Sequence, residues 1–222
     1  MLPDFEHPPG ELRDAFWQAF NLSLATLAAA DYDQFRSRYN NQAPYRTRNS
    51  RPWTDLVTRH SDSVLGHALE RLTKDGYLPA NGERSSERFM DLLYFTGNWW
   101  AGTRQALLAV EVENDWKELR GTLRDLLQFQ ARTKVAVFYY LASERIQTEV
   151  VEAMKSVAAS FLNAGYAEAA STAYLLIIAP DEWPAMAAPD FPVCSAFSFT
   201  GISDLDRGIW IRTSLPLVRR DS

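Results

Sequence analysis

Two glutamates stand two positions apart inside an apolar run, QALLAVEVE at residues 105–113. Because side chains alternate across a β-strand, Glu111 and Glu113 are expected on one face, together with Leu107 and Ala109. The run is largely apolar on both faces, which is typical of a strand that is covered on both sides. Exposure to solvent at a sheet edge is therefore a weak explanation for the two carboxylates.

A third carboxylate precedes them in the run RFMDLLYF at residues 88–95. If the chain turns near Ala101, antiparallel pairing sets Asp91 opposite Glu111, and directly opposed residues have Cβ atoms roughly 4.5–5.5 Å apart. Like charges opposed across strands are destabilising. A folded protein tolerates such a group of acids through raised pKa values, through exposure, or through a bound cation.

Oxygen ligands of this kind suit the hard cations Mg²⁺ and Mn²⁺, which are held by one or two carboxylates together with water and substrate phosphate. Such an ion polarises a phosphoryl oxygen and supplies hydroxide near neutral pH. The alternative is a set of three acids around a water-filled cleft without an ion. The spacing of the acids leaves both interpretations open.

Hydrophobic periodicity predicts the elements that position these acids. Helices are expected from after Pro9 to Ala30 and at 61–75, 115–132 and 143–165, where apolar residues recur every three or four positions. Short apolar runs predict strands at 88–95, 105–113, 134–141 and 173–179, and one or two more within 191–201 and 207–215. The order indicates an α/β fold, a mixed β-sheet flanked by helices.

Composition limits the class of protein. The 222 residues carry a net charge of −5, with 46% hydrophobic and 23% charged residues, which is typical of a globular chain. We expect a single domain over 1–222, with a helical, arginine-rich part at 1–60, a core at 61–179 and C-terminal strands at 180–222. No apolar stretch is long enough to span a bilayer and the first residues are acidic, so a cytoplasmic protein without a membrane partner is expected. The single cysteine, Cys194, predicts no disulfide.

An arginine-rich segment at 34–60 departs from the overall negative charge. It contains six arginines against one acid, with tyrosine and tryptophan between them. Lysine-free arginine clusters favour planar partners such as phosphates or carboxylates, and the mixture suits contacts to nucleic acid. A solvated loop is the alternative. The predicted DNA-binding residues are Arg36, Arg38, Arg46, Arg48 and Arg51.

The order of these features resembles the PD-(D/E)XK superfamily of restriction-endonuclease-like nucleases. Asp91 is followed after about twenty residues by an acid pair in an apolar strand, then by an amphipathic helix and a hydrophobic strand, over roughly residues 61–179. The resemblance implies a restriction-endonuclease-like fold and Mg²⁺-dependent hydrolysis of DNA phosphodiester bonds, as in type II restriction enzymes. Asp91 and Glu111 then take the metal-ligand positions, and a homodimer is implied for cutting palindromic DNA.

The third position of the motif is usually lysine in that superfamily, whereas this chain has Glu113. A minority of its restriction enzymes have Glu-x-Glu, and there the second glutamate is proposed to orient or deprotonate the attacking water. The chain therefore allows three outcomes: Glu113 acts as the base, Lys117 or Lys134 replaces the motif lysine, or the site is inactive.

A helix in the superfamily often donates one more glutamate, and Glu70 and Glu87 are the candidates in this sequence. Two alternatives from other classes remain. One is a non-catalytic nucleic-acid-binding or interaction protein that keeps the fold, and the other is an unrelated α/β domain whose acids are structural.

Overall fold

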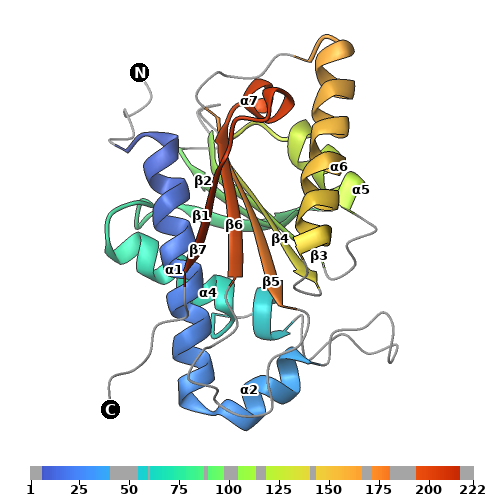
Figure 1. Cartoon of the computed structure of the whole chain (residues 1–222). Helices are drawn as coiled ribbons and strands as arrows, with labels where there is room; N and C mark the ends of the chain where they lie inside the picture. The colour runs from blue at the N-terminus through green and yellow to red at the C-terminus, as the bar shows by residue number, and fades with distance from the viewer. Residues whose placement is uncertain are drawn as a thin grey trace.

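The described part of the chain forms a seven-stranded sheet with helices on both faces (Figure 1). The computed structural model describes residues 7–40, 55–59, 61–87, 90–97, 105–113, 119–140, 144–166, 172–180 and 194–215. Its helices are α1 (Pro9–Ala30), α2 (Tyr32–Tyr39), the short π-helix η1 (Asp55–Arg59), α4 (Val64–Lys74), α5 (Leu119–Gln128), α6 (Glu144–Asn163) and α7 (Ile202–Arg207). Its strands are β1 (Glu83–Glu87), β2 (Met90–Thr96), β3 (Gln105–Glu113), β4 (Ala131–Tyr140), β5 (Ala173–Pro180), β6 (Cys194–Thr200) and β7 (Ile211–Leu215).

The strands lie in the sheet in the order of the sequence, β1 to β7. The pairs β3–β4 and β4–β5 are parallel, and the other neighbours are antiparallel. The predicted mixed sheet flanked by helices is therefore confirmed. Parallel neighbours need a crossover connection, and α5 and α6 provide the helical part of the two crossovers.

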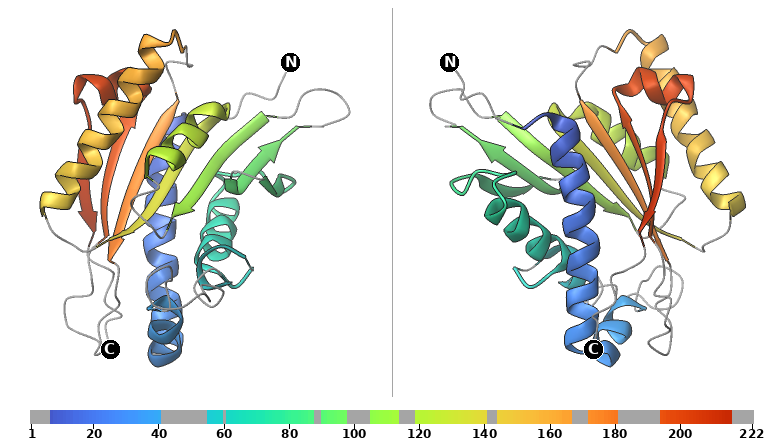
Figure 2. Two further views of the ribbon diagram at one scale, coloured as in Figure 1. Left: turned by 90° about the vertical axis from the view of Figure 1, so that its right-hand side faces the viewer. Right: turned by 60° about the vertical axis from the view of Figure 1, so that its left-hand side comes forward.

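Helices cover both faces of the sheet (Figure 2), and an apolar layer of buried side chains lies on each face. On the first face, α1 and α4 pack with alternate residues of β2 to β6. On the second face, α5, α6 and α7 cover the remaining sheet residues. We call these the α1 face and the α5 face. β3 and β4 contribute buried apolar side chains to both faces, which explains why their sequences lack a polar alternation.

Four elements of the described chain were not predicted by apolar periodicity. The sequence of β1, ERSSE, has no apolar residue, so its strand conformation depends on pairing with β2. The polar helix α2 begins at Asp31, whose side chain accepts a hydrogen bond from the Gln34 backbone at 3.0 Å. The other two are the short helices η1 and α7. In addition, the helix predicted to end at residue 132 ends at Gln128, because residues from Ala131 onward pair with β3.

The predicted face of one residue in β3 is wrong. Leu107 lies in the core of the α1 face together with Leu108, whereas Ala109 lies on the α5 face. The register shifts between the pairs Tyr94–Leu108 and Phe95–Ala106, so Leu107 has no partner in β2. An extra residue of this kind forms a β-bulge and interrupts the alternation of side chains. The α5 face of β3 therefore carries Ala109, followed by the two glutamates.

Candidate metal and phosphate site

Asp91 and Glu111 face one another at the point where β2 and β3 stop pairing through their backbones. The register places Leu92 opposite Val110, so Asp91 and Glu111 form the next pair, as predicted from the spacing. The Asp91 backbone donates to Oε2 of Glu111 at 3.1 Å. The Val112 backbone donates to Oδ2 of Asp91 at 2.9 Å. The carboxyl group of each residue is thus fixed by a backbone amide of the opposite strand.

The carboxyl group of Glu111 carries the strongest electrostatic perturbation in this arrangement. Burial raises its pKa first, and the charge of Asp91 raises it further, to about 8 in all. The hydrogen bond from the Asp91 backbone lowers the pKa, and Glu113 and Asp125 contribute smaller increases. Like charges around a partly buried carboxyl group disfavour its ionised form. Glu111 is therefore largely protonated at neutral pH unless a cation enters the group.

Asp125 joins this group from α5, which packs against β3 and β4 through Leu123, Leu126 and Leu127. Its carboxylate acts on Glu111 through space and raises the pKa of that group. We call Asp91, Glu111, Glu113 and Asp125 the carboxylate group. The sequence contained no signal for Asp125, because its approach depends on how α5 rotates when its leucines are buried.

The carboxylate group lies toward the carboxyl ends of the parallel strands. Glu111 and Glu113 are the antepenultimate and last residues of β3, beside Ala136 and Phe138 of β4. In Figure 1 the parallel strands point toward the end of the molecule where α2 lies. Carboxyl ends of parallel strands are common ligand positions in open α/β sheets.

The arrangement of the carboxyl groups limits which metal ion the site could hold. Within the residues that the structure describes, no three His, Cys, Asp or Glu side chains are arranged to hold an ion between them. Two carboxyl groups, those of Asp91 and Glu111, are enough for Mg²⁺, because this ion keeps several waters and takes one or two carboxylates from the protein. A divalent cation would also relieve the repulsion that raises the pKa of Glu111. The chemistry of the pair therefore suits Mg²⁺ or Mn²⁺.

Lys134 lies on the α5 face of β4, beside Ala109, and is buried with only 2% of its surface exposed. Its ammonium group contacts the Tyr174 hydroxyl at 3.2 Å and lies 5.2 Å from the centroid of that ring. Tyr174 is on β5, so the ammonium group is directed to the side of β4 away from Glu111. The replacement of the motif lysine by Lys134 stays a prediction. Lys117, the other candidate, lies outside the described residues.

We expect the contact between Lys134 and Tyr174 to stabilise the fold rather than the site. Tyr174→Phe should lower the free energy of unfolding by about 1–3 kcal/mol, because a buried ammonium group loses one acceptor. Lys134→Met keeps much of the volume and removes the buried charge, so its effect should be small. In urea denaturation, the double variant should be less destabilised than the sum of the two single variants. Additive effects would show that the two side chains are not coupled.

The structure does not bring the described arginines of the arginine-rich segment to the carboxylate group. Arg36 and Arg38 lie on α2, which packs against α1 and η1. They are two positions apart, so they project from different sides of that helix. Their helix is at the end toward which the parallel strands point, but it is joined to the α1 face (Figure 1). Arg46, Arg48 and Arg51 lie outside the described residues.

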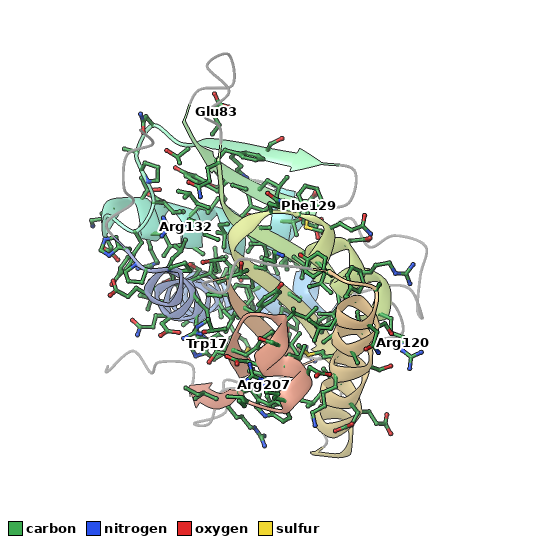
Figure 3. All side chains as sticks on the ribbon, turned by 90° about the horizontal axis from the view of Figure 1, so that it is seen from above. Trp17, Glu83, Arg120, Phe129, Arg132 and Arg207 are labelled. Atoms are coloured by element: carbon green, nitrogen blue, oxygen red, sulfur yellow. The ribbon has the colours of Figure 1, made fainter. Side chains whose placement is uncertain are left out.

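Glu70 and Glu87 were the candidates for one more glutamate in the site. Glu70 lies on α4, on the α1 face, and its side chain is 80% exposed, with Oε2 3.9 Å from Nδ1 of His67. It is therefore separated from Glu111 by the sheet. Glu87 ends β1, and its side chain lies outside the described residues. Among the side chains labelled in Figure 3, Arg120 of α5 and Arg207 of α7 are exposed.

No family model matches the chain, and no curated protein is significantly similar to it. Among the helices that the structure describes, none is long and apolar enough to cross a membrane.

Proposed function

We propose that this protein is a metal-dependent endonuclease that hydrolyses DNA phosphodiester bonds, as type II restriction enzymes do. The observation that carries the proposal is the opposed pair Asp91 and Glu111, in which each carboxylate is held by a backbone amide of the other strand. The order β2, β3, α5, β4 also agrees with the order of elements that the PD-(D/E)XK resemblance implies. The raised pKa of Glu111 adds weight, because perturbed acids concentrate at functional sites.

In this proposal, Asp91 and Glu111 hold Mg²⁺ or Mn²⁺ through carboxylate oxygens. The bound ion supplies charge stabilisation for the phosphoryl group and a more acidic water. Glu113 lies on the same face of β3 as Glu111 and accepts a proton from the attacking water. The water oxygen then bonds to phosphorus, the bond from phosphorus to the leaving sugar oxygen breaks, and solvent protonates that oxygen. The amides of Asp91 and Val112 keep the two ligands in place throughout.

The first experiment measures ion binding and cleavage together. Mg²⁺ or Mn²⁺ is titrated into the wild type and into Asp91→Ala/Glu111→Ala by calorimetry, and both proteins are incubated with a mixed pool of DNA and RNA. We expect binding and DNA cleavage in the wild type and neither in the variant. Salt-dependent DNA binding without metal-dependent cleavage would instead favour a non-catalytic nucleic-acid-binding protein. Absence of ion binding, DNA binding and cleavage would favour structural acids.

The substitution Glu113→Lys distinguishes the role of Glu113 from that of the two metal ligands, Asp91 and Glu111. Glu113→Lys restores the residue that the superfamily usually has at this position, and the lysine side chain can still orient water. We expect metal binding to be retained, and some cleavage to remain, because Asp91 and Glu111 are unchanged. Calorimetry and the same cleavage assay check this result, with Glu113→Gln as a neutral control. Loss of metal binding in Glu113→Lys would show that Glu113 is itself a ligand.

A further inference from the structure

Two buried polar atoms of α1 have no hydrogen-bond partner within the described part of the chain. They are Nε1 of Trp17 and Oδ1 of Asn21. Both residues are more than nine-tenths buried, with 6% and 4% of their surface exposed. A buried polar group without a partner lowers the stability of a fold, so native structures rarely leave one unpaired. The two atoms therefore indicate that a further polar group reaches this side of α1.

The other polar atom of the Asn21 side chain determines how its amide is oriented. Nδ2 donates a hydrogen bond to the Trp17 carbonyl at 2.8 Å. A carbonyl oxygen only accepts, so exchanging Nδ2 and Oδ1 would set two acceptors against each other. The unpaired atom of Asn21 is therefore an acceptor, whereas Nε1 of Trp17 is a donor. One group that accepts and donates at the same time would satisfy both atoms.

Trp17 and Asn21 lie one helical turn apart on the same side of α1. Arg13 precedes them by one more turn, and its guanidinium group donates to the Phe199 carbonyl of β6 at 3.5 Å. This row of three residues therefore lies on the β6 side of the helix, and Figure 3 shows Trp17 on the side of α1 toward the C-terminal strands. The unpaired atoms thus belong to the contact between α1 and the sheet.

We propose that one buried water molecule bridges Trp17 and Asn21 between α1 and the β6 side of the sheet. Its oxygen accepts the hydrogen bond from the Trp17 indole, and one of its protons is donated to Oδ1 of Asn21. Water is the smallest molecule that accepts and donates at once, which suits two side chains that are almost completely covered. The bridge does not depend on nuclease activity, and its tests need neither metal nor DNA.

Nuclear magnetic resonance of the isotope-labelled full chain detects such a water directly. The indole proton of Trp17 should show a cross-peak to water with the sign of a nuclear Overhauser effect from a long-lived bound molecule, rather than the sign of proton exchange. The chain has seven tryptophans, so Trp17→Phe assigns the signal by its loss. Asn21→Leu removes the acceptor and should abolish the cross-peak. A wild type without this cross-peak would overturn the proposal.

Ser23→Ala is the matched control for a nearby hydroxyl group. Ser23 is also buried in α1, two residues from Asn21, but its hydroxyl already donates to the Ala19 carbonyl at 2.7 Å. The cross-peak between the indole proton and water should therefore persist in Ser23→Ala. Its loss in this variant would assign the signal to the serine hydroxyl and refute the water bridge.

A double-variant cycle gives a second test that needs no spectral assignment. Trp17→Phe and Asn21→Leu each break one end of the bridge, and urea denaturation measures the loss of stability in each variant. If both side chains hold the same water, the double variant should lose less stability than the sum of the single variants, because donor and acceptor are then removed together. Additive losses would show that Trp17 and Asn21 do not share a bound molecule.

Discussion

Asp91→Asn should reduce metal-dependent DNA cleavage by about a thousandfold or more while leaving the fold intact. The asparagine side-chain oxygen can still accept the hydrogen bond from the Val112 backbone, which is 2.9 Å long in the wild type. The substitution therefore removes the negative charge but keeps the connection between β2 and β3. Loss of one ligand charge weakens Mg²⁺ binding, and charge stabilisation of the phosphoryl group is often the largest contribution to such a reaction. Single-turnover cleavage and calorimetry with Mg²⁺ measure the two effects.

A comparison of Asp91→Asn with Asp91→Ala distinguishes an effect on catalysis from an effect on the stability of the fold. Asp91→Ala removes the charge and also the acceptor of the Val112 amide, so it should lower the midpoint of thermal unfolding as well as activity. Asp91→Asn should match the wild type in thermal unfolding without metal, or exceed it, because repulsion with Glu111 is relieved. Wild-type cleavage rates in Asp91→Asn would remove Asp91 from the proposed site.

The free energy of unfolding should fall as the pH rises, because of Glu111. Its pKa is about 8 in the folded protein and near 4.5 in an unfolded chain. Between these values the folded state holds a proton that the unfolded state has released, so stability is complete below the lower value and is lost as pH rises through the higher one. Since Glu111 is partly exposed, we expect a loss of about 2 kcal/mol, well below the full linkage value.

Urea denaturation in metal-free buffer from about pH 5 to about pH 8.5 measures this dependence. Glu111→Gln carries no titrating group and should show a flatter pH profile than the wild type. Glu70→Gln is the control on the exposed side of α4 and should keep the wild-type profile. Excess Mg²⁺ should reduce the loss at high pH, because it favours the ionised carboxylate. Equal slopes in the wild type and Glu111→Gln would show that the acid is not perturbed.

Much of the geometry of the carboxylate group could be predicted from local patterns. The apolar runs 88–95 and 105–113 predicted β2 and β3, and the equal distance of Asp91 and Glu111 from the turn predicted that they are opposed. This inference works because antiparallel pairing fixes one strand's register once the other is placed. The apolar character of both faces of β3 also predicted its position inside the sheet. The nuclease activity remains a proposal that these positions support.

The tertiary structure decided features that depend on contacts between distant elements. A bulge opposite Tyr94 moved Leu107 to the α1 face, because the number of residues between paired positions differs in β2 and β3. Burial of the α5 leucines brought Asp125 toward Glu111, and the direction of Lys134 depends on Tyr174 in the next strand. The sequence by itself determined which residues alternate and pair within a hairpin. Only the packed fold decided which side chains from separate elements share one environment, because that depends on helix rotation and strand neighbours rather than on spacing.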